Sequence, residues 1–339
     1  MPYQKIIEKI DDLEELSAVG FPDGSVDNYC RFEKGKGRYM ESKDEVAERI
    51  ESNDSSSFRL EREKQEPGGK SLNMSMQCNS LGLDTAHYGF LDHELLENLD
   101  FETYSMGEPA QVTIGEFEQG SILLAHENKE LVDWSLESMK QFSGDIAELI
   151  SADVVGCANW IGLRHMNEEL KEIAGLDFEA EVFNFDPGNL TDVRPEIVRE
   201  MFETLEKLSE DYQVLVHANT DEVETTAEIY GIEGSIEEKI NLIQEQTGVT
   251  AYILHNKPRA VAGTEEGRFE VENLVTEHIE TRTGAGDRFD AGVASARAAG
   301  WRWEESLALG NLCAVHYVEN NETATPSDLR EQVEDKVKN

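Results

Sequence analysis

The stretch TGAGDRFDAG, residues 283–292, carries the strongest structural and chemical signal in this sequence. It lies where the chain leaves a strand and opens a long helix rich in small residues. Without β-carbons, Gly284 and Gly286 let consecutive backbone amides point into one concavity, and the helix start adds partial positive charge for an anion. Asp287 can then accept the proton of a hydroxyl while the amides from Gly284 through Ala285 to Gly286 hold a phosphoryl group. Taken alone, the motif equally fits a glycine-rich turn in which Asp287 only caps the helix.

Outward from this stretch, short apolar runs alternate with amphipathic segments. This alternation is typical of an α/β fold with a mostly parallel sheet and helices on both faces. The expected strands are 16–20, 84–89, 153–156, 180–185, 213–217 and 250–254. The expected helices are 71–81, 193–208, 235–246, 285–299 and 303–317.

Two segments depart from that alternation, residues about 28–66 and about 102–126. Their period-two patterning predicts antiparallel strands, and we interpret both as inserts that form a lid over a site. The chain has no mid-chain linker, which favours one domain over residues 1–339.

The net charge restricts the partners. The 71 acidic and 30 basic residues give a formal charge of -41, which excludes nucleic acid as a ligand because phosphate binding needs cationic side chains. It also disfavours anionic membrane surfaces, and no apolar window is long enough to span a membrane or to direct secretion. Molar salt would screen the self-repulsion of such a surface, so we expect a halophilic, cytoplasmic protein. The four cysteines have no paired spacing and are expected to be reduced thiols.

The segment Gly68-Gly69-Lys70-Ser71 invites comparison with a phosphate-binding P-loop. The spacing excludes that reading, because Lys64 stands where the P-loop needs its first glycine and the preceding residues are strongly charged.

Several motifs in one order resemble the PfkB family of ribokinase-like carbohydrate kinases. TGAGD is similar to the second signature of that family, and Gly68-Gly69 followed by Asn73 is similar to the first. Asp27, after the first strand, lies in a segment that resembles the one whose aspartate binds sugar hydroxyls. Residues 219–222 resemble the Asn-x-x-Glu motif, and residues 185–189 resemble the turn that precedes it.

The resemblance implies a ribokinase-like three-layer α/β/α sandwich with a mostly parallel central sheet and a small antiparallel β lid. It implies transfer of a phosphoryl group from ATP to a hydroxymethyl group of a sugar or sugar derivative, with Mg2+ as cofactor; it also allows K+ and a homodimer through the lid. Asp287 would be the base beside an anion hole of Gly284, Ala285 and Gly286. The implied binding residues are Asp27, Gly68, Gly69 and Asn73 for the sugar, Asn219 and Glu222 for magnesium, and Asn219 and Asn311 for the nucleotide.

The nucleotide side departs from the family pattern. Where the family carries Thr-x-Gly-x-x-Gly, this chain has residues 255–260, HNKPRA, in which Pro258 supplies no amide hydrogen. Lys257 and Arg259 are expected to bind the nucleotide phosphates instead, although both also fit a solvated turn. Thr281 replaces an aspartate that often precedes the second signature. Two alternatives stay open at this point, a nucleoside kinase of the same fold and a binding protein without turnover.

Overall fold

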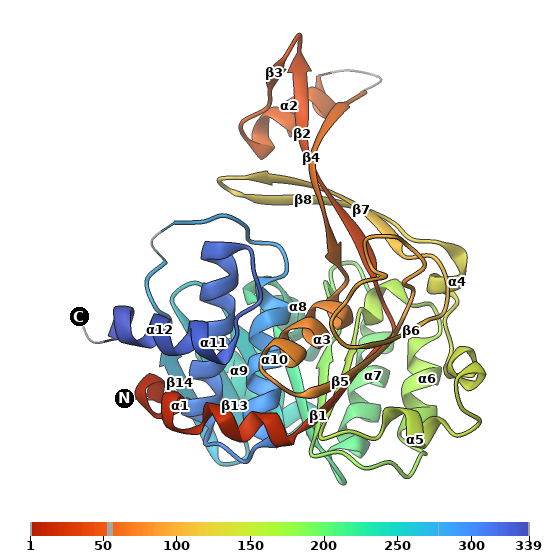
Figure 1. Ribbon diagram of the computed structural model, residues 1–339, viewed down its shortest axis with the longest axis vertical. Coiled ribbons are helices and arrows are strands. Elements are labelled where there is room, and N and C mark those ends of the chain that lie inside the picture. The colour runs from red at the N-terminus through yellow and green to blue at the C-terminus, as the bar shows by residue number, and fades with distance from the viewer. Residues whose placement is uncertain (1, 53–56, 277, 338–339) are drawn as a thin grey trace.

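The computed structural model describes residues 2–52, 57–276 and 278–337. Within them, a large sheet has the strand order β14-β13-β12-β11-β10-β9-β1-β5-β6 (Figure 1). Its strands are β1 (Ser17–Phe21), β5 (Asp84–Gly89), β6 (Glu102–Ser105), β9 (Val154–Ala158), β10 (Val182–Asp186), β11 (Gln213–Ala218), β12 (Ala251–His255), β13 (Arg259–Thr264) and β14 (Gly267–Glu272). The pairs from β6 to β12 are parallel, and β13 and β14 add an antiparallel hairpin at the edge.

Helices cover both faces of this sheet, and the strand residues show why. In β9 and β10, Val154 and Val182 pack into one apolar core, whereas their neighbours Val155 and Phe183 pack into another on the opposite face. The first face carries α1 (Pro2–Lys9), α3 (Lys70–Ser80), α10 (Ala285–Ala298), α11 (Trp303–Asn320) and α12 (Pro326–Val337). The second carries α6 (Met166–Ile173), α7 (Pro195–Leu208), α8 (Thr220–Tyr230) and α9 (Ile236–Thr247). The three-layer α/β/α sandwich expected from the sequence is therefore confirmed.

All six strands and five helices expected for the core are present, with ends shifted by a few residues. The hairpin of β13 and β14 was not anticipated, because its glycines and its charged residues break the apolar run that marks a buried strand. Shorter elements connect the layers: η1 (Ile10–Glu15), α2 (Lys43–Glu51), α4 (Lys129–Val132), η2 (Leu136–Gln141), α5 (Ile146–Ile150) and η3 (Trp160–Gly162).

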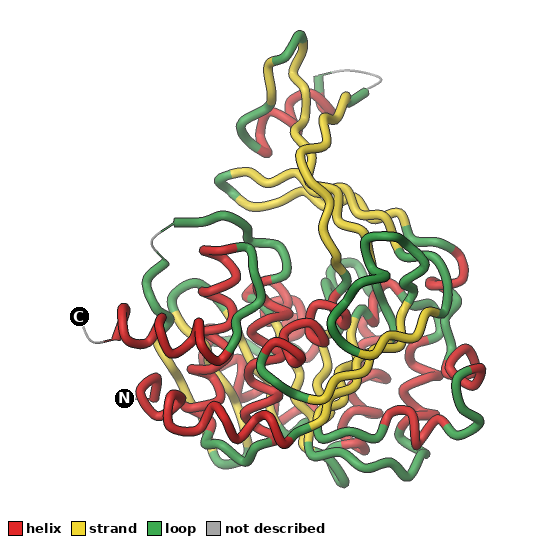
Figure 2. Tube along the Cα trace, in the orientation of Figure 1, coloured by secondary structure: helices red, strands yellow, loops and turns green. Residues whose placement is uncertain are grey.

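A small sheet rises from the edge of the sandwich, as the yellow strands in the upper part of Figure 2 show. It contains β2 (Ser25–Gly35), β3 (Arg38–Tyr39), β4 (Arg59–Gly68), β7 (Ala110–Phe117) and β8 (Gly120–His126). The pairs β2–β4 and β7–β8 are antiparallel as expected, but β2 and β7 pair in parallel.

The boundary of the second insert differs from the expectation. Glu102–Ser105 does not join the small sheet; it pairs with β5 at an edge of the large one. The physical reason is that β5 offers an unpaired edge there, and such an edge accepts any nearby extended segment.

Two further properties concern the setting of the protein. None of the helices in the described ranges has the length and apolar character needed to cross a membrane. The four cysteines are free, and three of them are buried: Cys78, Cys157 and Cys313.

Candidate active site

The start of α10 provides the centre of the site. Gly284 precedes the helix with φ 90°, a left-handed conformation that favours glycine. A β-carbon at Gly286 would lie 2.9 Å from the imidazole of His255, so only glycine fits at that close approach. The first amides of a helix have no acceptor within it, and they point toward the end of the helix where Asp287 stands. The residues predicted for the anion hole thus form the first turn of α10 together with Asp287, and within this turn the amide of Ala285 donates to the Arg282 carbonyl at 3.3 Å.

Asp287 is buried and held by two neighbours from α3. Asn73 donates its side-chain amide to Asp287 Oδ2 at 2.7 Å, and Lys70 Nζ lies 3.7 Å from Asp287 Oδ1. Burial raises the pKa of Asp287 above its usual value, and the Lys70 charge partly opposes that rise. A carboxylate with a raised pKa is a better proton acceptor near neutral pH.

Lys70 also binds Asp186, the last residue of β10. The Lys70 ammonium donates to Asp186 Oδ2 at 2.5 Å, and the amide of Gly188 donates to Asp186 Oδ1 at 2.8 Å. Burial alone would lower the pKa of Lys70, but the carboxylates of Asp186 and Asp287 raise it well above its usual value. Lys70 is therefore a permanent cation between the two carboxylates.

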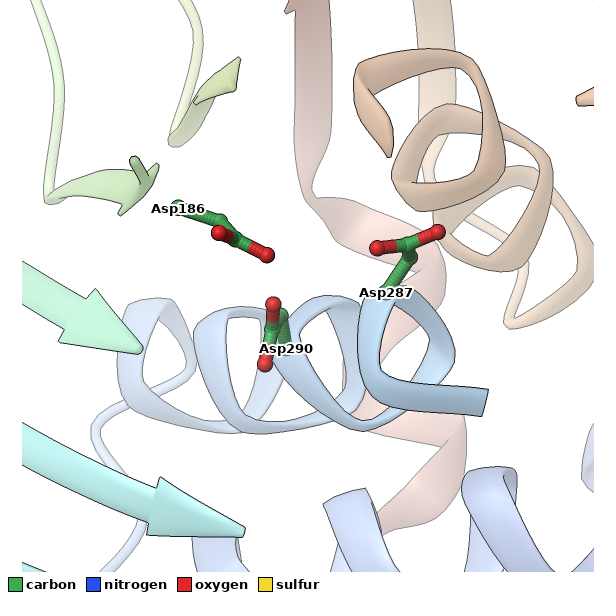
Figure 3. A group of neighbouring side chains, drawn as sticks. All are labelled: Asp186, Asp287 and Asp290. Atoms are coloured by element: carbon green, nitrogen blue, oxygen red, sulfur yellow. The ribbon is translucent and has the colours of Figure 1, made fainter. Parts of the chain in front are cut away.

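Three carboxylates converge at this point. Asp186, Asp287 and Asp290 place one oxygen atom each within 4.8 Å of one another. Figure 3 shows Asp287 and Asp290 rising from α10, and Asp186 reaching toward them from the opposite side. Asp290 is fully buried, with His217 Nδ1 2.9 Å from its Oδ1, and burial raises its pKa well above the usual value. Such a group of oxygen donors suits a divalent cation.

The Asn-x-x-Glu motif opens α8. Asn219 Oδ1 accepts from the amides of Asp221 and Glu222 at 2.9 and 3.1 Å, and Glu222 Oε2 accepts from the amide of Asn219 at 2.8 Å. This reciprocal pair caps the helix and fixes the Glu222 carboxylate, which is 8% exposed. Burial, with the nearby charge of Asp186 next in importance, raises the pKa of Glu222 to about 7.

The acceptor side is formed where β2 and β4 meet the start of α3. Asp27 is buried and accepts a hydrogen bond from Ser25 Oγ at 2.6 Å. A β-carbon at Gly68 would lie 2.2 Å from the Asp27 carboxyl carbon, so Gly68 leaves the room that this carboxylate occupies. Gly69 stands before α3 with φ 107°. Asp27, Gly68 and Gly69 thus lie at the start of α3, whose first turn carries Asn73, the fourth predicted sugar-side residue.

The start of α3 is held by a residue that the sequence analysis missed. Asp23 accepts hydrogen bonds from the amides of Lys70 and Ser71 at 3.0 and 2.8 Å. Because Gly69 has no side chain with which to cap the helix, Asp23 does so from the preceding loop. The sequence signal was the Pro22-Asp23-Gly24 turn directly after the first strand.

An open cavity of about 630 Å³ lies beside α10 and α11 on the side predicted for the nucleotide, and residues 255–258, 273–276 and 285–286 form part of its lining. Lys257 and Asn311 line it, and Asn311 also donates to the hydroxyl of Tyr3 at 3.1 Å. The side chain of Arg259 is directed elsewhere, because its Nη1 lies 2.6 Å from Glu270 Oε1 and 3.7 Å from Glu237 Oε1.

The family model of the prokaryotic ketohexokinases matches residues 25–336. The chain belongs to the prokaryotic ketohexokinase family. It is 26% identical over 302 residues to a ketohexokinase of Haloferax volcanii, a match that covers 84% of this chain and 80% of the relative.

Solved structures agree on the fold. A ribokinase-family nucleoside kinase of Methanocaldococcus jannaschii superposes with a TM-score of 0.64 at 17% identity and covers 94% of this chain and 98% of its own. Phosphofructokinase-2 of Escherichia coli gives 0.65 at 11% identity, with 93% and 97% covered. Ribokinase of Thermotoga maritima gives 0.60 at 18% identity, with 95% and 99% covered. This ketohexokinase-family chain is thus a carbohydrate kinase with the ribokinase-like fold that its motifs predict.

Proposed function

We propose that this member of the prokaryotic ketohexokinase family transfers the terminal phosphoryl group of ATP to the hydroxymethyl group of a ketose. One observation carries the proposal: Asp287 lies in the first turn of α10 with the predicted anion-hole glycines, and it accepts a hydrogen bond from Asn73 of the predicted acceptor side. The ketose is suggested by the name of the Haloferax volcanii relative.

The reaction uses these groups as follows. The acceptor hydroxyl gives its proton to the carboxylate of Asp287 while its oxygen forms a bond to the terminal phosphorus of ATP. The bond from that phosphorus to the bridging oxygen breaks, and ADP leaves with the electron pair. The amides at Gly284 to Gly286 stabilise the charge of the transferring group, and Lys70 adds a cation from the side of α3.

The carboxylates near Lys70 fit Mg2+. Asp186 and Glu222 are hard oxygen donors, and the raised pKa of Glu222, caused first by burial and then by Asp186, indicates two acidic groups that a divalent cation would stabilise. Asn219 holds Glu222 in place through the cap at the start of α8. Magnesium, when bound, supplies charge neutralisation at the phosphates. K+ remains a prediction from the resemblance, to be tested by replacing KCl with NaCl.

On the nucleotide side we propose Lys257 and Asn311 as ligands of ATP, because both line the cavity beside Gly286. The ion pairs of Arg259 with Glu237 and Glu270 speak against a direct role for that residue.

We also propose that the small sheet closes over the acceptor and joins two copies of the chain. Leu123 and Leu124 are 52% and 55% exposed on β8, which lies at the end of the strand order β3-β2-β7-β8. Exposed apolar residues on a free strand edge favour pairing with another chain. Light scattering after chromatography in molar salt would measure the oligomeric state. ATP as donor and four free cysteines support a cytoplasmic setting, and the charge of -41 supports a salt-rich one.

The deciding experiment measures ADP formation in molar KCl with Mg2+ over a panel of ketohexoses, aldoses and nucleosides. Turnover with ketohexoses supports the proposal. Turnover with nucleosides alone would establish the nucleoside kinase alternative, which the fold shared with the Methanocaldococcus jannaschii enzyme keeps in view. Tight binding of sugars without ADP formation would establish a binding protein.

A further inference from the structure

Arg288, the residue that follows Asp287, is a buried cation that forms no ion pair within the described part of the chain. It is 1% exposed, and its Nε and Nη1 atoms have no hydrogen-bond partner. Its guanidinium forms no ion pair with any residue in the described ranges and stacks on the ring of Tyr317, 4.4 Å from the ring centre. In a chain with 71 acidic residues, a buried arginine without a carboxylate partner requires an explanation.

The position of Arg288 places it at the acceptor. A β-carbon on Gly284 would lie 3.3 Å from Asn73 Nδ2, 3.4 Å from the Tyr317 hydroxyl and 3.5 Å from Arg288 Nη1. These three polar groups therefore meet beside the first glycine of the anion hole, on the side of α10 that faces α3 and α11.

The unpartnered atoms complement a hydroxyl group. Asn73 Oδ1 is a buried hydrogen-bond acceptor without a donor, and Arg288 Nε and Nη1 are buried donors without an acceptor. A hydroxyl both donates and accepts, so one sugar hydroxyl can satisfy groups of both kinds. Neither a carboxylate nor an ammonium group has this property at neutral pH.

We propose that Arg288 is a specificity-determining residue of the acceptor site, where its guanidinium donates to an oxygen of a neutral, polyhydroxylated sugar. The proposal rests on the sugar kinase function proposed above and adds the residue that selects the acceptor. The charge around it favours a neutral ligand. Burial raises the pKa values of Asp27 and Asp287, and the nearby charge of Arg288 partly offsets that rise. Both carboxylates lie near Arg288 without forming an ion pair with it, and they would repel an added phosphate or carboxylate on the sugar.

The same helix provides a matched control. Arg297 also stacks on an aromatic ring, that of Trp303 at 4.2 Å, and also has an unpartnered Nε. Its Nη2 donates to Gln213 Oε1 at 2.7 Å, away from the active site. Its Nη1 donates to the Trp301 carbonyl, and the residue as a whole is only partly buried. Arg297→Met therefore removes a ring-stacked guanidinium of the same helix without touching the acceptor.

The experiment compares the wild-type enzyme with Arg288→Met, Arg288→Lys and Arg297→Met. Kinetics are measured with a ketohexose and with its monodeoxy analogues. We expect Arg288→Met to lower acceptor kcat/KM by about 10- to 100-fold, the usual range for a hydrogen bond to a charged group. The KM for ATP should change less than about twofold, and Arg297→Met should leave both constants unchanged. With the wild-type enzyme, one deoxy analogue should have an acceptor kcat/KM lower than that of the ketohexose by the same factor. With Arg288→Met, this analogue and the ketohexose should have the same kcat/KM, because the oxygen that the guanidinium binds is missing in one and the guanidinium is missing in the other.

An unchanged acceptor kcat/KM in Arg288→Met overturns the proposal. An equal further loss of kcat/KM in Arg288→Met with every deoxy analogue also overturns it. Both results mean that the guanidinium forms no hydrogen bond with a specific oxygen of the sugar. If Arg288→Met fails to fold, Arg288→Lys, which keeps the charge but has no Nε, replaces it with the same criteria. If the wild-type enzyme phosphorylates no sugar, the proposed function fails, and Arg288 is still tested by calorimetric binding of the ketohexose. Equal affinity of the wild type and Arg288→Met for the ketohexose then overturns the proposal. A lower affinity in Arg288→Met, with the affinity of Arg297→Met unchanged, supports it.

Discussion

On the proposed acceptor side of Asp287 the polar side chains are buried and several are hydrogen-bonded to one another, whereas on the proposed nucleotide side they line an open cavity or pair with residues outside it. Asp27 is bonded to Ser25, and Asn73 to Asp287. By contrast, Lys257 is exposed at the cavity rim, and Arg259 pairs with Glu270. The acceptor side is preorganised for its ligand, so small changes there should strongly lower acceptor kcat/KM. On the nucleotide side, the phosphates would be bound by the exposed side chain of Lys257, which is not held in one position.

The largest effect is expected at the point where the two sides meet. Asp287→Asn keeps the shape and the bond to Asn73 but cannot take the proton of the acceptor. We expect kcat to fall by about 100- to 10,000-fold, with both KM values nearly unchanged. Steady-state ADP formation measures this, with circular dichroism as the control for folding. Near-normal turnover in a folded variant would remove Asp287 as the base.

The acceptor side should respond next. Asp27→Ala and Asn73→Ala each leave hydroxyls of the bound sugar unpaired, which should lower acceptor kcat/KM by about 5- to 150-fold. Gly68→Ala tests the contact of Asp27 with the sugar indirectly, because the new β-carbon would lie 2.2 Å from the Asp27 carboxyl carbon and displace the carboxylate. All three should spare the KM for ATP. A variant impaired only in ATP affinity would place these residues on the nucleotide side.

A pH profile sharpens the assignment of Asp27. Burial raises the pKa of Asp27 to about 6, so below that pH the carboxylate is protonated and can no longer accept two hydroxyl hydrogen bonds. Because Asp287 and Glu222 also have raised pKa values, the effect of Asp27 is measured as the ratio of acceptor kcat/KM in the wild type to that in Asp27→Asn. This ratio should fall about tenfold per pH unit below pH 6 and level off above it. Asp27→Asn should start from a lower plateau and lose this limb. A limb that persists in Asp27→Asn would belong to another group.

The contrast between the two sides also separates what the sequence predicted from what it did not. The three layers were predictable, because short apolar runs alternate with amphipathic segments. The roles of Asp287 and the four sugar-side residues came from the resemblance and stay predictions; the structure places these residues at the starts of α10 and α3. Lys70 escaped notice: it was considered only as part of a P-loop, and its place between Asp186 and Asp287 depends on contacts 116 and 217 residues apart in the chain. Asp290 was missed for the same reason, since its burial against His217 depends on how α10 crosses the sheet.

The direction of a side chain on an exposed turn depends on partners that no local pattern names. Lys257 and Arg259 flank one proline and looked equivalent in the sequence. The hairpin of β13 and β14, which the sequence pattern did not reveal, places Glu270 beside Arg259.

The smallest effect is expected on the nucleotide side. Lys257→Ala removes a cation that lines the cavity and should raise the KM for ATP by about 3- to 10-fold, the modest range of a solvent-exposed contact with a phosphate. Arg259→Ala removes a neighbouring cation of the same sign whose partners are Glu237 and Glu270, so it should change the KM for ATP by less than about twofold. Raising KCl should shrink the Lys257 effect, because salt screens exposed charges. An equal rise in the KM for ATP in both variants would indicate that the two cations act through their general positive charge. An unchanged KM in both would mean that neither side chain binds the phosphates, and the amides of Gly284 to Gly286 would be the remaining candidates.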